Sequence, residues 1–241
     1  MSIRSVALAA LALPFVLAAA GSPARAEEPP IGAESAAAEP PPPLVRELAD
    51  WAVASGDNAG LPFAIIDKAS ASVFVFGSYG TLLGAEPALI GEAVGDDSVP
   101  GIGDRPLSKI RPHERTTPAG RFVGGFGPAL GQEKETLWVD YGTAISLHPV
   151  VTTNRKERRV KRLNSPTPAD NRITYGCINV SAAFYDSVIR NAFGMSKGVF
   201  YILPEEKPLD EVLPAFAVQA RVAAADADRY GQQAYGVGRA P

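Results

Sequence analysis

The chain contains one cysteine, Cys177, and two histidines, His113 and His148. Cys177 follows Gly176 directly in the stretch RITYGCINV. A thiol attacks a carbonyl carbon as the thiolate, so it needs a base or a local field that lowers its pKa. A glycine beside it lets the backbone approach a substrate closely. Cys177 is therefore either a small buried hydrophobic residue or a nucleophile.

The two histidines differ as candidates for the base. His148 ends an apolar run, TAISLHPV, and the end of a strand at a cleft is a common place for a catalytic base. His113 lies among charged residues in RPHER, which is typical of a solvated loop. Taken alone, His148 also fits a satisfied histidine at a strand edge, and a lone cysteine is commonly a packing residue. The candidate pair is therefore Cys177 with His148.

The elements that must position this pair are mostly strands. β-rich runs begin at residue 62 and form a meander, and further predicted strands cover residues 121–126, 135–147, 173–177 and 199–203. Predicted loops cover residues 92–120 and 149–171, and predicted helices cover residues 44–54, 180–193 (capped by Ser181) and 208–229. The run after Cys177 reads as the start of a helix, whose free N–H groups would favour a thiolate. The fold class is mainly β, or α+β.

Composition divides the chain into four parts. Residues 1–26 read as an export signal, with Arg4 before an apolar run and Ala24-Arg25-Ala26 as the cleavage site. Residues 27–43 are rich in Pro, Ala and Glu and are expected to form an extended tether. Residues 44–205 form one domain, and residues 206–241 form a helical extension and tail. After cleavage no segment is expected to stay in the membrane.

Charge and cysteine content exclude several classes of function. Removing residues 1–26 takes away Arg4 and Arg25 and no acid, which changes the net charge from −3 to −5. This balance gives no electrostatic case for nucleic acid. Two histidines and one cysteine are too few for a structural zinc site. An exported protein with one cysteine cannot form an internal disulfide, so its thiol must be buried or used.

Three motifs together resemble a known family. TTPAGRF (116–122), LH (147–148) and TYGCINV (174–180) occur in the order of the L,D-transpeptidase catalytic domain, also called the YkuD domain. The resemblance covers roughly residues 61–204. It implies a β-sandwich catalytic domain with one or two flanking helices.

The resemblance also assigns roles by position. It implies that Cys177 is the nucleophile and His148 the general base, with backbone N–H groups of residues 175–177 as the oxyanion hole. The other motif residues carried over are Thr174, Tyr175, Gly176 and Asn179. Many members have His where this chain has Tyr175, and the 29 positions from His148 to Cys177 exceed the usual family interval.

The implied reaction is acyl transfer in the periplasm or cell envelope. The donor is a peptidoglycan stem tetrapeptide, which forms a thioester on Cys177 and loses D-Ala. The acceptor is an amine, either of a second stem peptide, giving a 3–3 cross-link, or of an envelope protein. This chemistry serves cell-wall organisation and cell shape, needs no cofactor or metal, and implies acylation of Cys177 by carbapenems. The alternatives are an L,D-carboxypeptidase or amidase that uses water, and a non-catalytic peptidoglycan-binding module.

A basic segment precedes the cysteine motif. Residues 155–162, RKERRVKR, hold six basic residues and one acid. This segment is either a solvated loop without a partner or a lid that helps hold carboxylates of the substrate. Arg172 is the preferred residue for such a contact. Trp138 and Tyr141 are assigned to the core first, and to a cleft second.

Overall fold

The computed structural model describes residues 40–129, 135–222 and 224–225. The predicted export signal, most of the predicted tether and the end of the predicted tail lie outside the described residues. Within the described part of the chain, no helix is both long and apolar enough to cross a bilayer.

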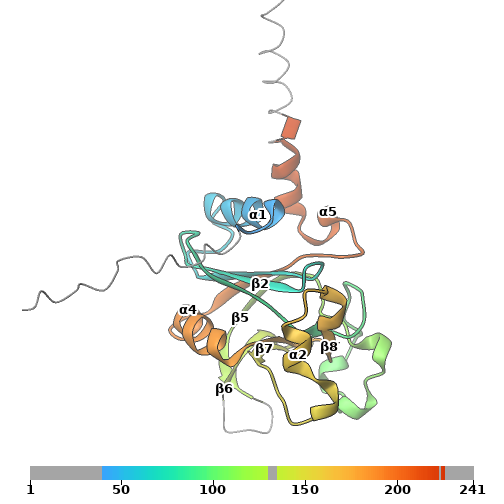
Figure 1. Ribbon diagram of the computed structural model, residues 1–241. Helices are drawn as coiled ribbons and strands as arrows, with labels where there is room; N and C mark the ends of the chain where they lie inside the picture. Colours follow the sequence, from blue (N-terminus) through green and yellow to red (C-terminus); the bar gives the residue numbers. More distant parts are fainter. Residues whose placement is uncertain (1–39, 130–134, 223, 226–241) are drawn as a thin grey trace, which may run out of the picture. The chain divides into compact units, whose positions relative to one another are not determined.

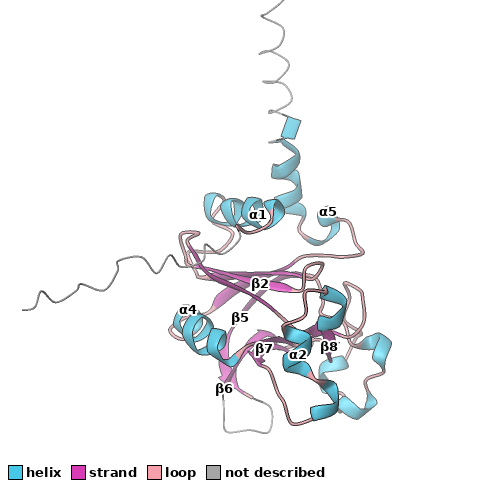
Figure 2. Cartoon of the chain, in the orientation of Figure 1, coloured by secondary structure: helices cyan, strands magenta, loops and turns pink. Residues whose placement is uncertain are grey.

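Ten strands form the centre of the described chain, and helices and loops surround them (Figure 2). The strands are β1 Phe63–Asp67, β2 Ser72–Phe76, β3 Leu82–Pro87, β4 Ile90–Gly91, β5 Gly120–Pro128, β6 Glu135–Asp140, β7 Ile145–Pro149, β8 Arg172–Thr174, β9 Ile178–Val180 and β10 Gly198–Ile202. Eight of them form one sheet in the order β3-β2-β1-β10-β5-β6-β7-β9, and β4 pairs with β8. The predicted meander is confirmed, because β1, β2 and β3 pair antiparallel in succession.

The helical elements are short and lie between or outside the strands. They are α1 Pro43–Ala54, η1 Ile102–Asp104, η2 Leu107–Lys109, η3 Pro112–Glu114, η4 Arg155–Glu157, α2 Arg159–Leu163, η5 Pro168–Asn171, α3 Ala182–Phe184, η6 Tyr185–Ile189, α4 Arg190–Phe193 and α5 Leu209–Val212. A further helix covers residues 214–222. Both regions predicted as long loops therefore hold short helical turns.

The large sheet folds over on itself along β5. Residues 120–124 of this strand pair with β10, and residues 125–128 pair with β6. Gly124 stands where the pairing changes, and a Cβ there would lie 1.9 Å from the carbonyl oxygen of Trp138. Only glycine fits this approach, so the sequence of β5 allows the two halves of the sheet to share one strand.

Strands β1, β2 and β10 carry an apolar core on each of their two faces. One core joins side chains of β1 and β2 to side chains of β6, β7 and β9 and to η6. The other packs the opposite face of β1, β2 and β10 against α1 and Phe216, as the position of α1 beside β2 in Figure 1 illustrates. The fold is thus mainly β and sandwich-like with flanking helices, which confirms the predicted fold class.

Two predicted elements are wrong. Residues 135–147 are not one strand but a hairpin, because the Asp140 carboxylate accepts the N–H groups of Gly142 and Thr143 and turns the chain. The residues after Cys177 do not begin a helix. They form β9, and the next helix starts at Ala182, where Ser181 caps it as predicted. A helix N-terminus therefore does not stabilise a thiolate at Cys177.

Candidate active site

Parallel pairing of β7 with β9 brings the predicted pair together. The register sets Leu147 opposite Ile178 and His148 opposite Asn179. Cys177 stands one residue before β9, so it lies beside the hydroxyl of Ser146, with 3.5 Å between Sγ and Oγ. Residues far apart in the sequence thus meet at one end of the two strands.

A tight turn presents Cys177 between β8 and β9. Thr174 closes it, because its hydroxyl donates to the carbonyl of Cys177 at 2.6 Å and accepts the N–H of Gly176 at 3.1 Å. Gly176 has φ +124°, and a Cβ there would lie 2.6 Å from the carbonyl oxygen of Thr116. The position therefore admits only glycine. Thr174 and Gly176 shape the turn, as their motif positions imply.

The hydrogen bonds of His148 define its tautomer. Its Nδ1 lies 2.9 Å from the carbonyl oxygen of Pro149, which can only accept, so Nδ1 carries the proton. The amide nitrogen of Asn179 lies 3.0 Å from Nε2. In the neutral ring Nε2 holds the free lone pair, so Asn179 donates to it. Both ring nitrogens thus face a defined partner.

Cys177 and His148 shift each other's pKa. Burial raises the pKa of the Cys177 thiol, but hydrogen bonding and charge from His148, with contacts to Ser146, outweigh it and leave the pKa lowered. Burial lowers the pKa of His148, but hydrogen bonding and charge from Cys177 and the carbonyl of Pro149 leave it raised. Both directions favour a thiolate beside an imidazolium, which is the reactive form of a cysteine nucleophile.

The expected oxyanion donors differ in availability. The N–H of Gly176 is already bonded to Thr174. The N–H groups of Tyr175 and Cys177 make no hydrogen bond to any residue that the structure describes. Two of the three predicted donors therefore remain for a ligand.

A cavity of about 1030 Å³ opens at the thiol. Its walls include Ser146, His148, Tyr175 and Cys177. Trp138 also lines it while its side chain is largely buried, so this residue belongs both to the core and to the cleft. Tyr141 is exposed on the turn between β6 and β7, so its expected place in the core is wrong.

Arg172 does not line this cavity. Its guanidinium forms an ion pair with Glu205 and donates to the carbonyls of Gly91 and Ala93. The predicted contact with substrate therefore lacks support, because the donors of Arg172 are used by the protein itself. The arginines on the cavity wall are Arg105 and Arg190.

Tyr175 is held from one side by a cation. The guanidinium of Arg115 lies over the ring, 4.1 Å from its centroid, and forms an ion pair with Glu92 at 2.5 Å. Such a stack fixes the ring without using its hydroxyl. His113, the other histidine, is exposed on η3.

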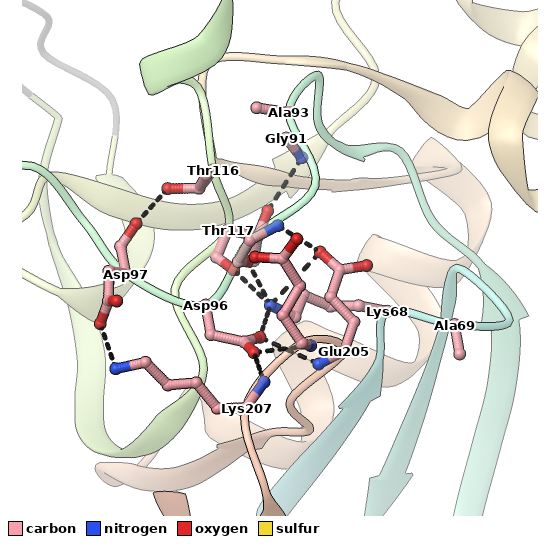
Figure 3. A network of polar contacts seen from close by, with 12 residues as sticks. Lys68, Ala69, Gly91, Ala93, Asp96, Asp97, Thr116, Thr117, Glu205 and Lys207 are labelled. Atoms are coloured by element: carbon pink, nitrogen blue, oxygen red, sulfur yellow. Dashed lines mark hydrogen bonds and ion pairs between the residues drawn. The ribbon is translucent and has the colours of Figure 1, made fainter.

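A buried polar network around Lys68, drawn in Figure 3, is joined to the turn through Thr117. Lys68 is fully buried; its Nζ lies 2.6 Å from Asp96 and donates to the carbonyls of Gly95 and Thr117. The hydroxyl of Thr117 in turn donates to the carbonyl of Gly176 at 2.8 Å. The backbone next to the thiol is therefore tied to a buried ion pair.

Sequence reasoning missed three contributors to the site. Ser146 lies two positions before His148 on the same strand, and the two-residue period of a strand points both to one side. Thr117 lies inside the quoted motif TTPAGRF, but its partner comes from a distant segment. Arg159 donates to Asn179 at 3.1 Å and carries no local signal that separates it from its basic neighbours.

Comparison with known proteins finds distant similarity to some solved structures. No family model and no curated protein matches the chain. Among solved structures, an L,D-transpeptidase from Mycobacterium smegmatis is similar at 15% identity and TM-score 0.32, over 59% of this chain and 58% of that one. The catalytic domain of an L,D-transpeptidase from E. faecium is similar at 13% identity and TM-score 0.35, over 58% of this chain and 95% of that one.

A third solved structure is the helical cell shape determining protein Pgp2 from Campylobacter jejuni, at 14% identity and TM-score 0.40, over 67% of this chain and 57% of that one. The chain thus spans under two thirds of the M. smegmatis and C. jejuni chains. The function proposed below rests on the motifs and on the geometry of the site.

Proposed function

We propose that the protein is an exported cysteine acyltransferase that acts on peptidoglycan stem tetrapeptides in the cell envelope. The observation that carries this proposal is the pairing of β7 with β9, which sets Ser146, His148 and Cys177 together on the wall of one cavity. A lowered thiol pKa beside a histidine of raised pKa is what covalent acyl transfer requires.

The proposed reaction runs in two halves. The Cys177 sulfur attacks the carbonyl of the third residue of the stem as His148 holds the thiol proton, and the N–H groups of Tyr175 and Cys177 stabilise the oxyanion. The C–N bond then breaks, and D-Ala leaves as an amine that receives the proton from His148. An acceptor amine attacks the thioester and gives a proton to His148. The C–S bond breaks, and His148 returns that proton to the sulfur of Cys177.

The cavity offers cations for the carboxylates of such a donor. Arg105 pairs with Glu114 through Nη1, at 3.2 Å. Its Nε and Nη2 are buried and have no partner among the described residues, so this edge of the guanidinium binds an anion once the side chains that cover it move. Arg190 lines another part of the wall and pairs with Asp186. We assign the substrate carboxylate to Arg105 in place of Arg172.

Product analysis tests the proposal. The protein and its Cys177→Ala variant are incubated with a disaccharide-tetrapeptide, and products are identified by mass. A cross-linked dimer that has lost one D-Ala is the expected product of the wild type alone. A monomer that has only lost D-Ala would make the protein a hydrolase instead. No turnover, with both proteins alike, would favour a binding module.

A further inference from the structure

The basic segment, residues 155–162, brings one arginine close to the candidate base. Most of its residues are exposed, but the side chain of Arg159 at the start of α2 retains only 13% of its exposure. Its Nη1 donates to Oδ1 of Asn179 at 3.1 Å, and its Nε is held by Glu157 at 2.5 Å. This contact joins α2 to β9, where Asn179 stands opposite His148 of β7.

This contact fixes which way the Asn179 amide points. A guanidinium can only donate, so it must meet the amide oxygen, and the amide nitrogen then faces His148. The side chain of Asn179 is fully buried, so its amide cannot turn toward bulk solvent. A flipped amide would set its NH₂ group against the guanidinium, leaving buried donors unpaired. Arg159 therefore selects the orientation in which Asn179 donates to Nε2.

The orientation matters for the protonation of His148. An Asn179 that donates to Nε2 favours the neutral ring, whereas a flipped amide would accept from Nε2–H and favour the imidazolium. The positive charge of Arg159 also opposes protonation of the ring. The charged and titratable groups that act on the ring are thus Cys177 from the turn, which favours the imidazolium, and Arg159 from α2, which opposes it.

We propose that Arg159 is a positioning residue for His148, and that the basic segment serves to bring this guanidinium to Asn179 rather than to cover the cavity. Arg159 would serve the acyl transfer proposed for this site. Only the predicted effect of Arg159 on turnover rests on that proposed function. Arg159 does not line the cavity, so it acts through Asn179 and not on substrate.

An arginine is needed for this bridge. Its two contacts use Nε and Nη1, so one planar group joins Glu157 to Asn179. Lysine carries the same charge as a single point and cannot hold both partners in that fixed geometry. Charge and geometry can therefore be separated by substitution.

The test is a pH titration of the imidazoles by NMR. The chain has only two histidines, and His113→Gln assigns the signals. In Arg159→Met the titration midpoint of His148 moves to higher pH, because both the opposing charge and the amide orientation are lost. In Arg159→Lys it moves less far in the same direction. Lys161→Met removes an equal charge from the exposed face of the same helix and leaves the midpoint unchanged.

An unchanged or lower midpoint in Arg159→Met would overturn the inference, and so would an equal shift in Lys161→Met. If Arg159→Met does not fold, the Arg159→Lys midpoint decides by itself. Turnover gives the second readout: in Arg159→Met the basic limb of the pH profile of kcat moves to higher pH together with the His148 midpoint, while KM stays the same. If the wild type does not turn over stem peptides, the proposed function fails, but the NMR titration still decides the role of Arg159.

Discussion

The hydroxyl of Thr117 donates to the carbonyl of Gly176 at 2.8 Å and accepts the N–H of Gly91 at 2.9 Å. One buried side chain therefore ties the backbone beside the candidate nucleophile to β4. The carbonyl of Thr117 also accepts a hydrogen bond from the ammonium of Lys68. The turn is therefore held by contacts with distant segments as well as by its own residues.

Thr117→Val tests this tie. Valine has the shape of threonine without the hydroxyl, so two buried backbone groups lose their partner, at a cost of about 1–3 kcal/mol in the free energy of unfolding. Urea denaturation measures that loss, and iodoacetamide alkylation of Cys177 reports whether the turn has shifted. Thr117→Ser keeps the hydroxyl and is the control. Equal stability of the Val and Ser variants would contradict the account.

Gly176→Ala is expected to damage the site more than an equivalent glycine change elsewhere. Its Cβ would lie 2.6 Å from the carbonyl oxygen of Thr116 and 2.7 Å from Cδ1 of Ile145, at a φ of +124°. Gly101 has a φ of +70° and no atom near its missing Cβ, so Gly101→Ala carries only the backbone cost of about 1–2 kcal/mol. Thermal unfolding should separate the two variants. Similar losses for both would argue against steric exclusion at Gly176.

The pH dependence of thiol alkylation tests the pairing of Cys177 with His148. The wild-type rate should rise with pH through a midpoint below 9.0, the ordinary value for a thiol, because His148 lowers the pKa of Cys177. His148→Ala removes this effect and moves the midpoint to higher pH. His113→Ala changes an exposed ring and should leave it in place. An unmoved midpoint in His148→Ala would show that the two side chains are not coupled.

Lys68→Met should strongly destabilise the protein. It leaves Asp96 buried without its ammonium partner, which costs about 3–5 kcal/mol. Burial raises the pKa of Asp96, but Lys68 and three backbone N–H groups lower it to about 2 from 3.8. The carboxylate therefore adds stability that is present above pH ~4 and lost as pH falls toward 2. Unfolding measured between these values should show this slope in the wild type.

The control for that substitution is Lys109→Met, since Lys109 is exposed and makes no ion pair within the described chain. If the Lys68→Met protein were as stable as the control, the buried network would not stabilise the fold.

Substitution of Arg105 should affect substrate binding, whereas substitution of Arg172 should affect the stability of the fold. Arg105→Met should raise KM for a carboxylate-bearing donor with kcat little changed, because the residue lines the cavity. Arg172→Met should instead lower the free energy of unfolding by about 1–3 kcal/mol, because it leaves Glu205 and two carbonyls without this donor. Steady-state kinetics and urea denaturation on both variants measure the difference. The opposite pattern would restore Arg172 as the substrate contact.

The sequence predicts those site residues that lie in short motifs, and it does not predict those whose partners lie far away in the chain. Cys177 and His148 are the conspicuous residues of short motifs, and the strand ending at His148 is visible in its apolar run. The helix expected after Cys177 fails because Ile178 and Val180 are β-branched and pair with β7, so tertiary pairing decides their conformation. The ion pair of Arg172 could not be predicted, because its partner Glu205 lies 33 positions further along the chain, after β10.

Contacts between distant segments are what the sequence leaves hidden. Lys68 reads as a charged turn residue, yet it is among the most buried side chains, because residues 95–96 and Thr117 surround its ammonium. Arg159 is one of six basic residues in a short run, and only the fold distinguishes it from the others. Long-range partners of this kind have no period or spacing that a linear pattern can reveal.

The most direct test of the central claim is to trap the covalent intermediate. The protein is mixed with a stem tetrapeptide, quenched in acid and analysed by intact mass and by peptide mapping. The account predicts an adduct equal to the donor minus D-Ala, located on the peptide that contains Cys177 and missing in Cys177→Ala. Turnover of the donor without such an adduct on Cys177, or the same adduct in Cys177→Ala, would contradict it.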